Sequence, residues 1–229
     1  MEYLVLILLL LLMLIALKII CKVNIKKIEA IGKNELLDER INKFPSNVEM
    51  CKKILKKIGN ESVEVEEDID ASNCLYIVAT NKIIIGYLRG SFTRIQTIAH
   101  ECLHSIQDKV LLMFNFIYSN IYLLTFIVFC ILALFKVIQY KMLFISIFII
   151  MGFIFYFIRS YLEIDAMTKA RFLAKEYIEE ENILNKEEFE QVINEYDKLN
   201  NMGIIATNYS LLLGVIVKTI ILTILFMIL

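Results

Sequence analysis

Histidine is nearly missing from this chain of 229 residues, which contains only His100 and His104. Tryptophan is absent and there is a single proline, and neither scarcity restricts the fold class or the function. A large excess of charge is missing too, because the formal net charge is −1, which argues against a nucleic-acid partner. Histidine is therefore not a common filler here, and its two positions are the first place to look for chemistry.

Paired cysteines are missing as well. The cysteines are odd in number and scattered, so their spacing does not indicate a disulfide framework. A thiol-reducing, cytoplasm-facing environment fits this pattern. The five residues are Cys21, Cys51, Cys74, Cys102 and Cys130.

Long apolar runs, in contrast, are abundant. Hydrophobic residues make up 59% of the chain and the mean hydropathy is +0.67, which exceeds what a soluble domain carries. The excess lies in residues 3–20, 114–135, 142–158 and 204–229, each near the roughly 20 residues that a bilayer core requires. The first run lacks a basic leading segment and a small-x-small cleavage site, so we expect it to remain as an anchor. The sequence predicts a mainly α membrane protein with four transmembrane helices.

Basic residues near the ends of these runs predict the orientation. Only Glu2 precedes the first run, whereas four lysines crowd its C-terminal end: Lys18, Lys22, Lys26 and Lys27. By the positive-inside rule, the N-terminus faces out and the segment after the first run faces the cytoplasm. The basic residues before the second run and after the third agree, and Lys136 and Lys141 in the short hairpin do not.

The runs divide the chain into five parts. We expect a transmembrane anchor helix at 1–21, a cytoplasm-facing α+β region at 22–112, a transmembrane hairpin at 113–158, a cytoplasmic helical segment at 159–203 and a transmembrane helix at 204–229. Lys218 lies inside the last run, where a charge either snorkels or faces the helix bundle.

Local signals place short elements in the α+β region. A helix at 34–44 is stopped by Pro45, and Ser46 with Glu49 forms a capping box for a helix that ends at Gly59. The four lysines of that helix, at 52, 53, 56 and 57, form either a solvated face or a patch for anionic headgroups. Alternation at 63–66 and a hairpin at 74–86 predict a small sheet, whose edge serves either a structural role or strand addition by an extended peptide. A helix at 91–108 follows, with Ser91 as its cap.

The two histidines stand four apart on this last helix, with Glu101 directly after the first. Two imidazoles at that spacing lie on one helical face and can share a metal ion, and the glutamate reaches a water bound to it. Chance produces this arrangement in about one such chain in a thousand, which makes it a weak competitor. Cys102, two residues after His100, points off the ligand face and is a spacer.

Zinc needs a third protein ligand, and in this topology a carboxylate on the inner side is the remaining choice. Glu163 lies about one turn past the third run, on the same helical side as Ala166, Ala170 and Ala174, whose small size allows close approach of another helix. The alternative for Glu163 is a solvated interfacial carboxylate. Asp165 faces elsewhere and is a candidate for orienting a histidine.

The segment after these alanines is acidic, at Glu176 and residues 179–181, and we interpret it as a solvated face. Asn185 and Glu188 then form a second capping box, which opens a helix with an apolar stripe. The stripe consists of Phe189, Val192, Ile193, Tyr196 and Leu199.

Two motifs and the order of spans resemble the YugP-type neutral zinc metallopeptidases of bacterial membranes, and more distantly the HtpX-type membrane proteases. The motifs are His100-Glu101-Cys102-Leu103-His104-Ser105-Ile106-Gln107 and Leu162-Glu163-Ile164-Asp165-Ala166, followed by Ala206-Thr207-Asn208-Tyr209 in the last span. The resemblance implies that His100, His104 and Glu163 bind zinc, that Glu101 is the catalytic base, and that the α+β region is gluzincin-like. Cys102-Leu103 departs from the family, which commonly has Gly before the second histidine, and Met167 stands where Ser is usual.

The expected function is therefore a zinc-dependent endopeptidase of the plasma membrane that uses a zinc-activated water and Glu101 as general base. Its substrates would be proteins or peptides, membrane proteins among them, at the cytoplasmic face of a bacterial membrane. A further donor to the oxyanion would come from one of four residues: Tyr161, Arg159, Arg94 or Tyr87. The alternative is a non-catalytic membrane protein with a structural zinc site that serves binding or assembly.

Overall fold

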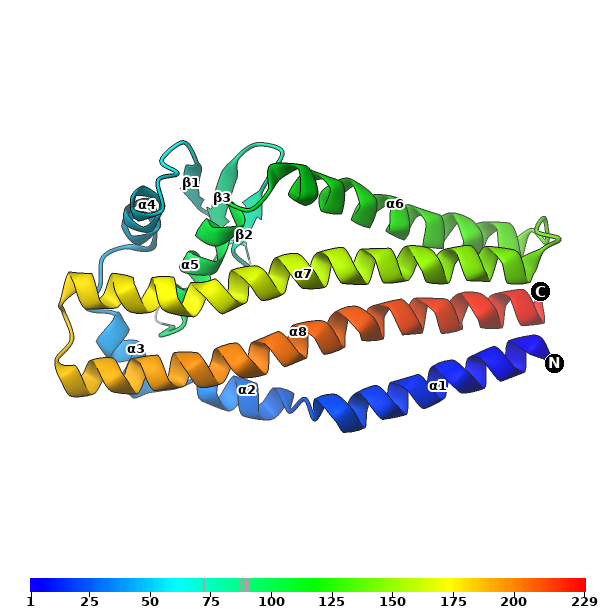
Figure 1. Cartoon of the computed structure of the whole chain (residues 1–229), viewed down its shortest axis with the longest axis horizontal. Coiled ribbons are helices and arrows are strands. Elements are labelled where there is room, and N and C mark those ends of the chain that lie inside the picture. Colours follow the sequence, from blue (N-terminus) through cyan, green and yellow to red (C-terminus); the bar gives the residue numbers. More distant parts are fainter. Residues whose placement is uncertain (72, 87, 89–90) are drawn as a thin grey trace. The chain divides into compact units, whose positions relative to one another are not determined.

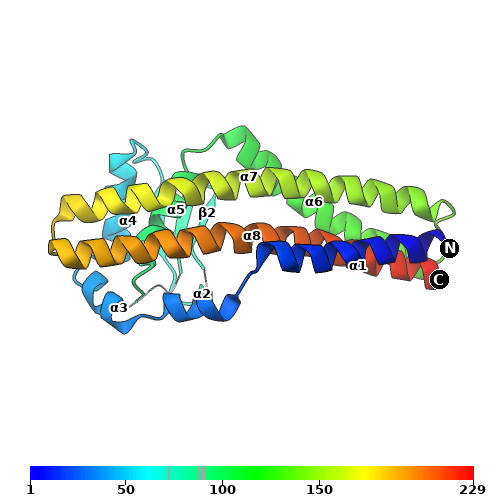
Figure 2. The ribbon, with the colours of Figure 1, turned by 60° about the horizontal axis from the view of Figure 1, so that its bottom comes forward.

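The computed structural model describes residues 1–71, 73–86, 88 and 91–229, so Tyr87 lies outside the described residues. These residues form two compact units (Figures 1 and 2). The first, which we call the apolar unit, comprises residues 1–23, 114–161 and 205–229. The second, the polar unit, comprises residues 24–113 and 162–204.

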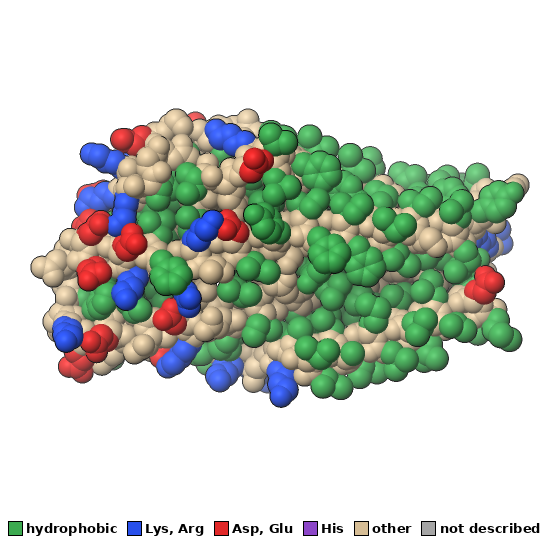
Figure 3. Space-filling model, viewed as in Figure 1, with side chains coloured by type: hydrophobic (Ala, Val, Ile, Leu, Met, Phe, Trp, Pro, Cys, Tyr) green, Lys and Arg blue, Asp and Glu red, His purple; other side chains and the backbone are tan. Residues whose placement is uncertain are grey.

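Within the described residues, four helices are long and apolar enough to cross a membrane. They are α1 (Glu2–Cys21), α6 (Lys109–Leu134), α7 (Lys141–Glu181) and α8 (Lys186–Ile228). Large apolar side chains on these helices are exposed, among them Leu8, Leu124 and Phe157, and Figure 3 shows many hydrophobic side chains on one face of the apolar unit. Such a surface is suited to lipid. The mainly helical fold is confirmed, and so is the prediction of four helices long and apolar enough to span a membrane.

Aromatic side chains form the centre of the apolar unit. The rings of Tyr122 and Phe148 stack with centroids 4.9 Å apart, and Leu222 and Phe226 of α8 belong to the same buried cluster. Lys218 Nζ lies 5.0 Å from the centroid of the Tyr122 ring. Lys218 therefore faces the helix bundle, where the negative face of the ring partly compensates its charge.

The helices α7 and α8 continue well beyond the apolar runs. No proline interrupts either helix, so the backbone hydrogen bonds continue where the side chains change from apolar to polar. The helix expected after Asn185 is therefore the first part of α8 and not a separate element. Its capping box is confirmed, since Glu188 donates its N–H to Asn185 Oδ1 and accepts the Asn185 N–H.

The polar unit contains three short helices before its sheet: α2 (Ile25–Gly32), α3 (Glu35–Ile41) and α4 (Asn47–Lys57). Asn34 caps α3, and Ser46 caps α4 by accepting the Glu49 N–H. Gly59, with a φ of 72°, follows the end of α4. The described strands are β1 (Glu64–Glu67), β2 (Leu75–Ile77) and β3 (Lys82–Ile85). Their order is β1-β3-β2, with β1 parallel and β2 antiparallel to β3, which confirms the small sheet.

The histidine-bearing helix α5 (Arg94–His104) packs against α4 and against strands β2 and β3. Its buried side chains are Ile95, Ile98, Ala99, Cys102 and Leu103. The predicted cap at Ser91 is wrong, because α5 begins three residues later and the Ser91 hydroxyl instead accepts the Thr93 N–H within its own turn. The helix also ends earlier than expected, at His104, where Asn60 Nδ2 donates to the Ser105 carbonyl over 3.0 Å.

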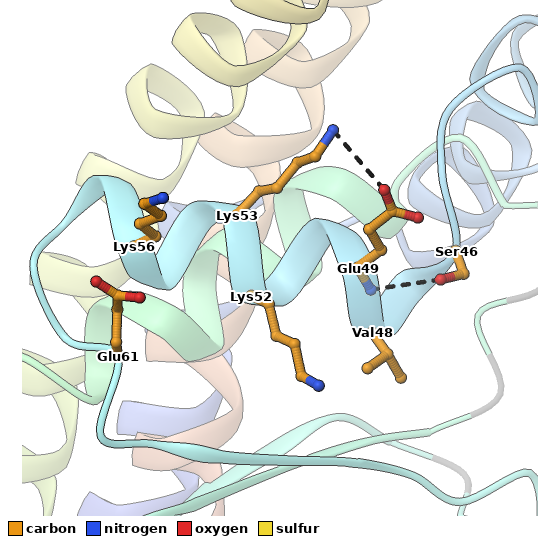
Figure 4. A pocket seen from close by; sticks show the side chains of 7 residues that line it. All are labelled: Ser46, Val48, Glu49, Lys52, Lys53, Lys56 and Glu61. Carbon is orange, nitrogen blue, oxygen red and sulfur yellow. Dashed lines mark hydrogen bonds and ion pairs between the residues drawn. The ribbon is translucent and has the colours of Figure 1, made fainter.

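The lysine face of α4 and the acidic end of α7 are not simply solvated. Lys53 Nζ lies 2.9 Å from Glu181 Oε1, and Lys57 Nζ lies 2.5 Å from Glu180 Oε1. Figure 4 shows the remaining lysines of this face, Lys52 and Lys56, beside a groove next to α4. Ion pairs thus tie α4 to the end of α7, although exposed pairs of this kind contribute little stability individually.

Candidate metal centre

The side chains of His100 and His104 meet Glu163 in the polar unit. The two Nε2 atoms are 3.0 Å apart, and Glu163 Oε2 lies 3.3 Å from His100 Nε2 and 3.8 Å from His104 Nε2. His104 and Glu163 are buried, whereas the His100 side chain keeps 18% of its surface exposed. The helices α5 and α7 thus place three ligand atoms within 4.8 Å of one another, although Glu163 follows His104 by 59 residues and His100 by 63 in the sequence.

This geometry fits a small divalent cation. In a tetrahedral site with bonds of about 2.0–2.1 Å, the ligand atoms are about 3.3 Å apart, and the three measured separations lie around that value. Two imidazole nitrogens and one carboxylate oxygen suit zinc better than magnesium or calcium, which prefer oxygen ligands throughout. Three protein ligands also leave a fourth position for a water or a substrate atom.

Charges around the site favour a bound cation. Burial raises the pKa of Glu101, although His100, His104 and a hydrogen bond from Tyr76 oppose the rise. Burial alone would lower the pKa of His104, but the nearby Glu163 carboxylate and the negative charge of Glu101 outweigh it and raise this pKa. Two buried carboxylates thus draw positive charge into the site, and a divalent ion can supply that charge in place of protons.

Gln107 is the residue that sequence reasoning missed. Its Nε2 donates to the Leu162 carbonyl and to Asp165 Oδ2, over 2.9 Å in each case, so its Oε1 is left to accept from His104 Nδ1 at 2.8 Å. A proton on Nδ1 leaves the lone pair of Nε2 free to bind a metal ion. The signal for Gln107 was its place three residues after His104, one turn further along the chain.

Asp165 acts on His104 through Gln107 and not directly. Its other oxygen lies 2.5 Å from Lys169 Nζ. Burial raises the pKa of Asp165, but the bonds from Lys169 and Gln107 outweigh it and lower this pKa. Asp165 is therefore an anion that holds the Gln107 amide in the orientation that the histidine needs.

Glu101 points toward the sheet. Its Oε2 accepts the N–H of Tyr76 over 2.7 Å, and only 7% of the residue is exposed. Tyr76 lies opposite Ile83 in the pairing of β2 with β3, and its N–H is directed to Glu101 of α5 and not to β3. The carboxylate is thus held next to both histidines by a strand of the sheet.

Of the other candidate donors, Arg94 has both terminal nitrogens engaged in hydrogen bonds to residues at 41–47. It is 6% exposed and donates to the carbonyls of Ile41, Phe44 and Pro45, so it stabilises the turn after α3. Tyr161 and Arg159 belong to the apolar unit. Arg159 stands four residues before Glu163 on α7 and shares its helical face, whereas Tyr161, two residues before, is on another face and 62% exposed.

The alanines that were expected to allow close approach of another helix are buried. Ala166, Ala170 and Ala174 are fully or almost fully buried along α7. Cys102 is buried on the side of α5 away from the imidazoles, with its Sγ 3.6 Å from Cys51 Sγ of α4.

No family model matches this chain, and neither a curated protein nor a solved structure matches it.

Proposed function

We propose that this protein is a membrane-embedded, zinc-dependent endopeptidase with a gluzincin-like catalytic region, related to the YugP-type metallopeptidases. The observation that carries the proposal is the convergence of His100, His104 and Glu163 beside Glu101. A histidine pair four residues apart, a distant carboxylate and an adjacent glutamate are the donor set and base of zinc peptidases.

Each of these residues has a distinct role in the proposed reaction. His100, His104 and Glu163 hold the ion, which when bound supplies Lewis-acid polarisation and lowers the pKa of water. Glu101, whose pKa is raised by burial, accepts a proton at its carboxylate and passes it to the leaving amine. Gln107 keeps the proton of His104 on Nδ1.

The substrate is proposed to be a protein or peptide segment in an extended conformation. Support comes from the outer edge of β2, whose Tyr76 N–H already points at Glu101. Because Glu101 already accepts the Tyr76 N–H, an extended chain would pair with neighbouring positions of this edge and so pass beside the general base. We further propose a plasma-membrane location in a bacterium with the site on the cytoplasmic side, supported by the four apolar helices and by the lysines that follow α1.

One observation favours a second candidate, a non-catalytic zinc site that serves binding or assembly. The Glu101 carboxylate is buried and hydrogen-bonded to the Tyr76 amide, as a purely structural group would be. The two functions differ in what the loss of Glu101 does, because a structural zinc site works without a base.

The test compares the full-length protein in detergent with its Glu101→Gln and Glu163→Ala variants, with Glu179→Ala as the control for an exposed carboxylate on the same helix. Zinc content is measured by elemental mass spectrometry and proteolysis with a casein substrate. We expect Glu101→Gln to keep zinc and lose about 10²- to 10⁴-fold in activity. Glu163→Ala should lose zinc, and Glu179→Ala should change neither.

Undiminished proteolysis by Glu101→Gln would contradict the peptidase. Zinc bound at full stoichiometry without Glu163 would contradict the ligand set. Zinc binding with no proteolysis by any form would favour the second candidate.

A further inference from the structure

Two cysteines meet in the interior of the polar unit, behind the metal centre. Cys51 of α4 and Cys102 of α5 are both completely buried, their sulfur atoms are 3.6 Å apart, and both are free thiols. They are 51 residues apart in the sequence, so the pairing comes from the packing of α4 on α5. Cys102 lies between His100 and His104 in the sequence and directly follows Glu101.

We propose that Cys51 and Cys102 are an oxidisable pair, and that the disulfide between them weakens metal binding at His100, His104 and Glu163. The effect on metal binding rests on the proposed zinc site, whereas formation of the disulfide does not. The site would then be fully competent only under reducing conditions.

The reaction is a two-electron oxidation by a peroxide. One thiol is oxidised by hydrogen peroxide to a sulfenic acid with release of water, and the second thiol attacks that sulfur, so that a second water leaves and the S–S bond forms. Overall, two thiols and one H₂O₂ give one disulfide and two waters. Hydrogen peroxide is small and uncharged, which suits a pair in a packed interior. A thiol reductant reverses the step by exchange.

The geometry predicts how the disulfide acts on the site. An S–S bond of about 2.05 Å requires the two sulfur atoms to approach by roughly 1.5 Å from their present separation of 3.6 Å. Cys102 is two positions from each histidine, which places it on the opposite side of α5 from the imidazoles. Contraction toward α4 therefore draws α5 away from Glu163.

A small share of this movement is enough. If α5 moves by about a third of the contraction, the histidines shift by roughly 0.5 Å, whereas metal–ligand distances tolerate about 0.2 Å. Disturbing the groups that hold a metal ligand in its orientation typically weakens metal binding by about 10- to 100-fold. We expect a loss in that range on oxidation.

The experiment uses the full-length protein in detergent with Cys21, Cys74 and Cys130 replaced by serine, so that only the pair remains. One sample is kept in a phosphine reductant and another is treated with hydrogen peroxide. Peptide mapping under non-reducing conditions detects the link between residues 51 and 102, and competition with a chromophoric chelator measures the zinc dissociation constant. Cys51→Ala in the same background is the matched control, since it undergoes the same exposure to peroxide without forming the link.

We expect the 51–102 link, zinc binding weakened about 10- to 100-fold, full recovery on reduction, and no change in Cys51→Ala. Absence of the link, an unchanged zinc affinity in linked protein, or an equal loss in Cys51→Ala would each overturn the proposal. A reduced protein that binds no zinc at all would instead show, before any oxidant is added, that the proposed metal site is wrong, and the effect on metal binding would fall with it.

Discussion

Replacing Gln107 by methionine removes the link between His104 and α7 while keeping the length of the side chain. The structure has three hydrogen bonds to lose: the acceptor for His104 Nδ1 at 2.8 Å, and the two donations at 2.9 Å to Leu162 and Asp165. Without that acceptor, His104 can place its proton on Nε2, the atom that faces His100 and Glu163. The imidazole must then change tautomer before it can bind a metal ion.

Loss of such a supporting contact weakens metal binding by about 10- to 100-fold, or about 1.4–2.8 kcal/mol. Chelator competition on purified protein measures the change directly. Gln191→Met is the matched control, because Gln191 also joins two helices of the polar unit, through Arg40, but lies outside the metal centre. A zinc affinity within twofold of the unmodified protein for Gln107→Met would refute the role that we assign to the amide.

Three further predictions concern stability, measured by thermal unfolding in detergent. Arg94→Met leaves two buried carbonyls and one partly buried carbonyl without their donor, so it should destabilise the protein by about 3 kcal/mol. Arg171→Met should have a small effect, and equal effects would contradict the role assigned to Arg94. Gly152→Ala places a Cβ 2.6 Å from Val215 Cγ1 and should destabilise the protein by about 1–3 kcal/mol. In Gly214→Ala the new Cβ meets no atom within 4 Å, so this variant should be as stable as the unmodified protein or more stable. The reverse order of stabilities would contradict the packing of Gly152 against Val215. Hydrogen bonds from Asn185 and Lys43 hold the pKa of Glu188 below its ordinary value of 4.5, so its contribution is complete above that value and is lost as the pH falls through the lower, folded-state pKa. Glu188→Gln should therefore lower the Tm at neutral pH, and the difference should shrink as the pH is lowered below 4.5; a constant difference would contradict this account.

Features that depend on neighbours in the sequence were predictable. The cap formed by Asn185 with Glu188 and the cap formed by Ser46 with Glu49 each involve residues three apart, so the local sequence pattern predicted them. Each apolar helix contains a continuous apolar run, which was enough to locate it. The ends of these helices were harder to predict, because α7 changes from apolar to polar side chains without any break in its backbone.

Features that depend on distant partners were not predictable. From the sequence, Arg94 was a candidate donor to the oxyanion because it stands near the histidines. Its four acceptors, at residues 41–47, lie about 50 residues away in the sequence and could not be predicted from it. The sequence made Asp165 a candidate for orienting a histidine, but it did not indicate that the Gln107 amide lies between the two side chains. The contact between Cys51 and Cys102 likewise arises only when α4 packs on α5. For the metal centre, the spacing of the histidines indicated two ligands, and the choice of Glu163 depended on an assumed topology.

The most direct test of the proposed zinc site is X-ray absorption at the zinc edge on the purified, reduced, full-length protein. We predict one zinc per chain with two imidazole nitrogens and carboxylate oxygen at about 2.0–2.2 Å, and loss of that spectrum in Glu163→Ala. A protein without zinc, or a spectrum with sulfur ligands at about 2.3 Å, would contradict the assignment of His100, His104 and Glu163.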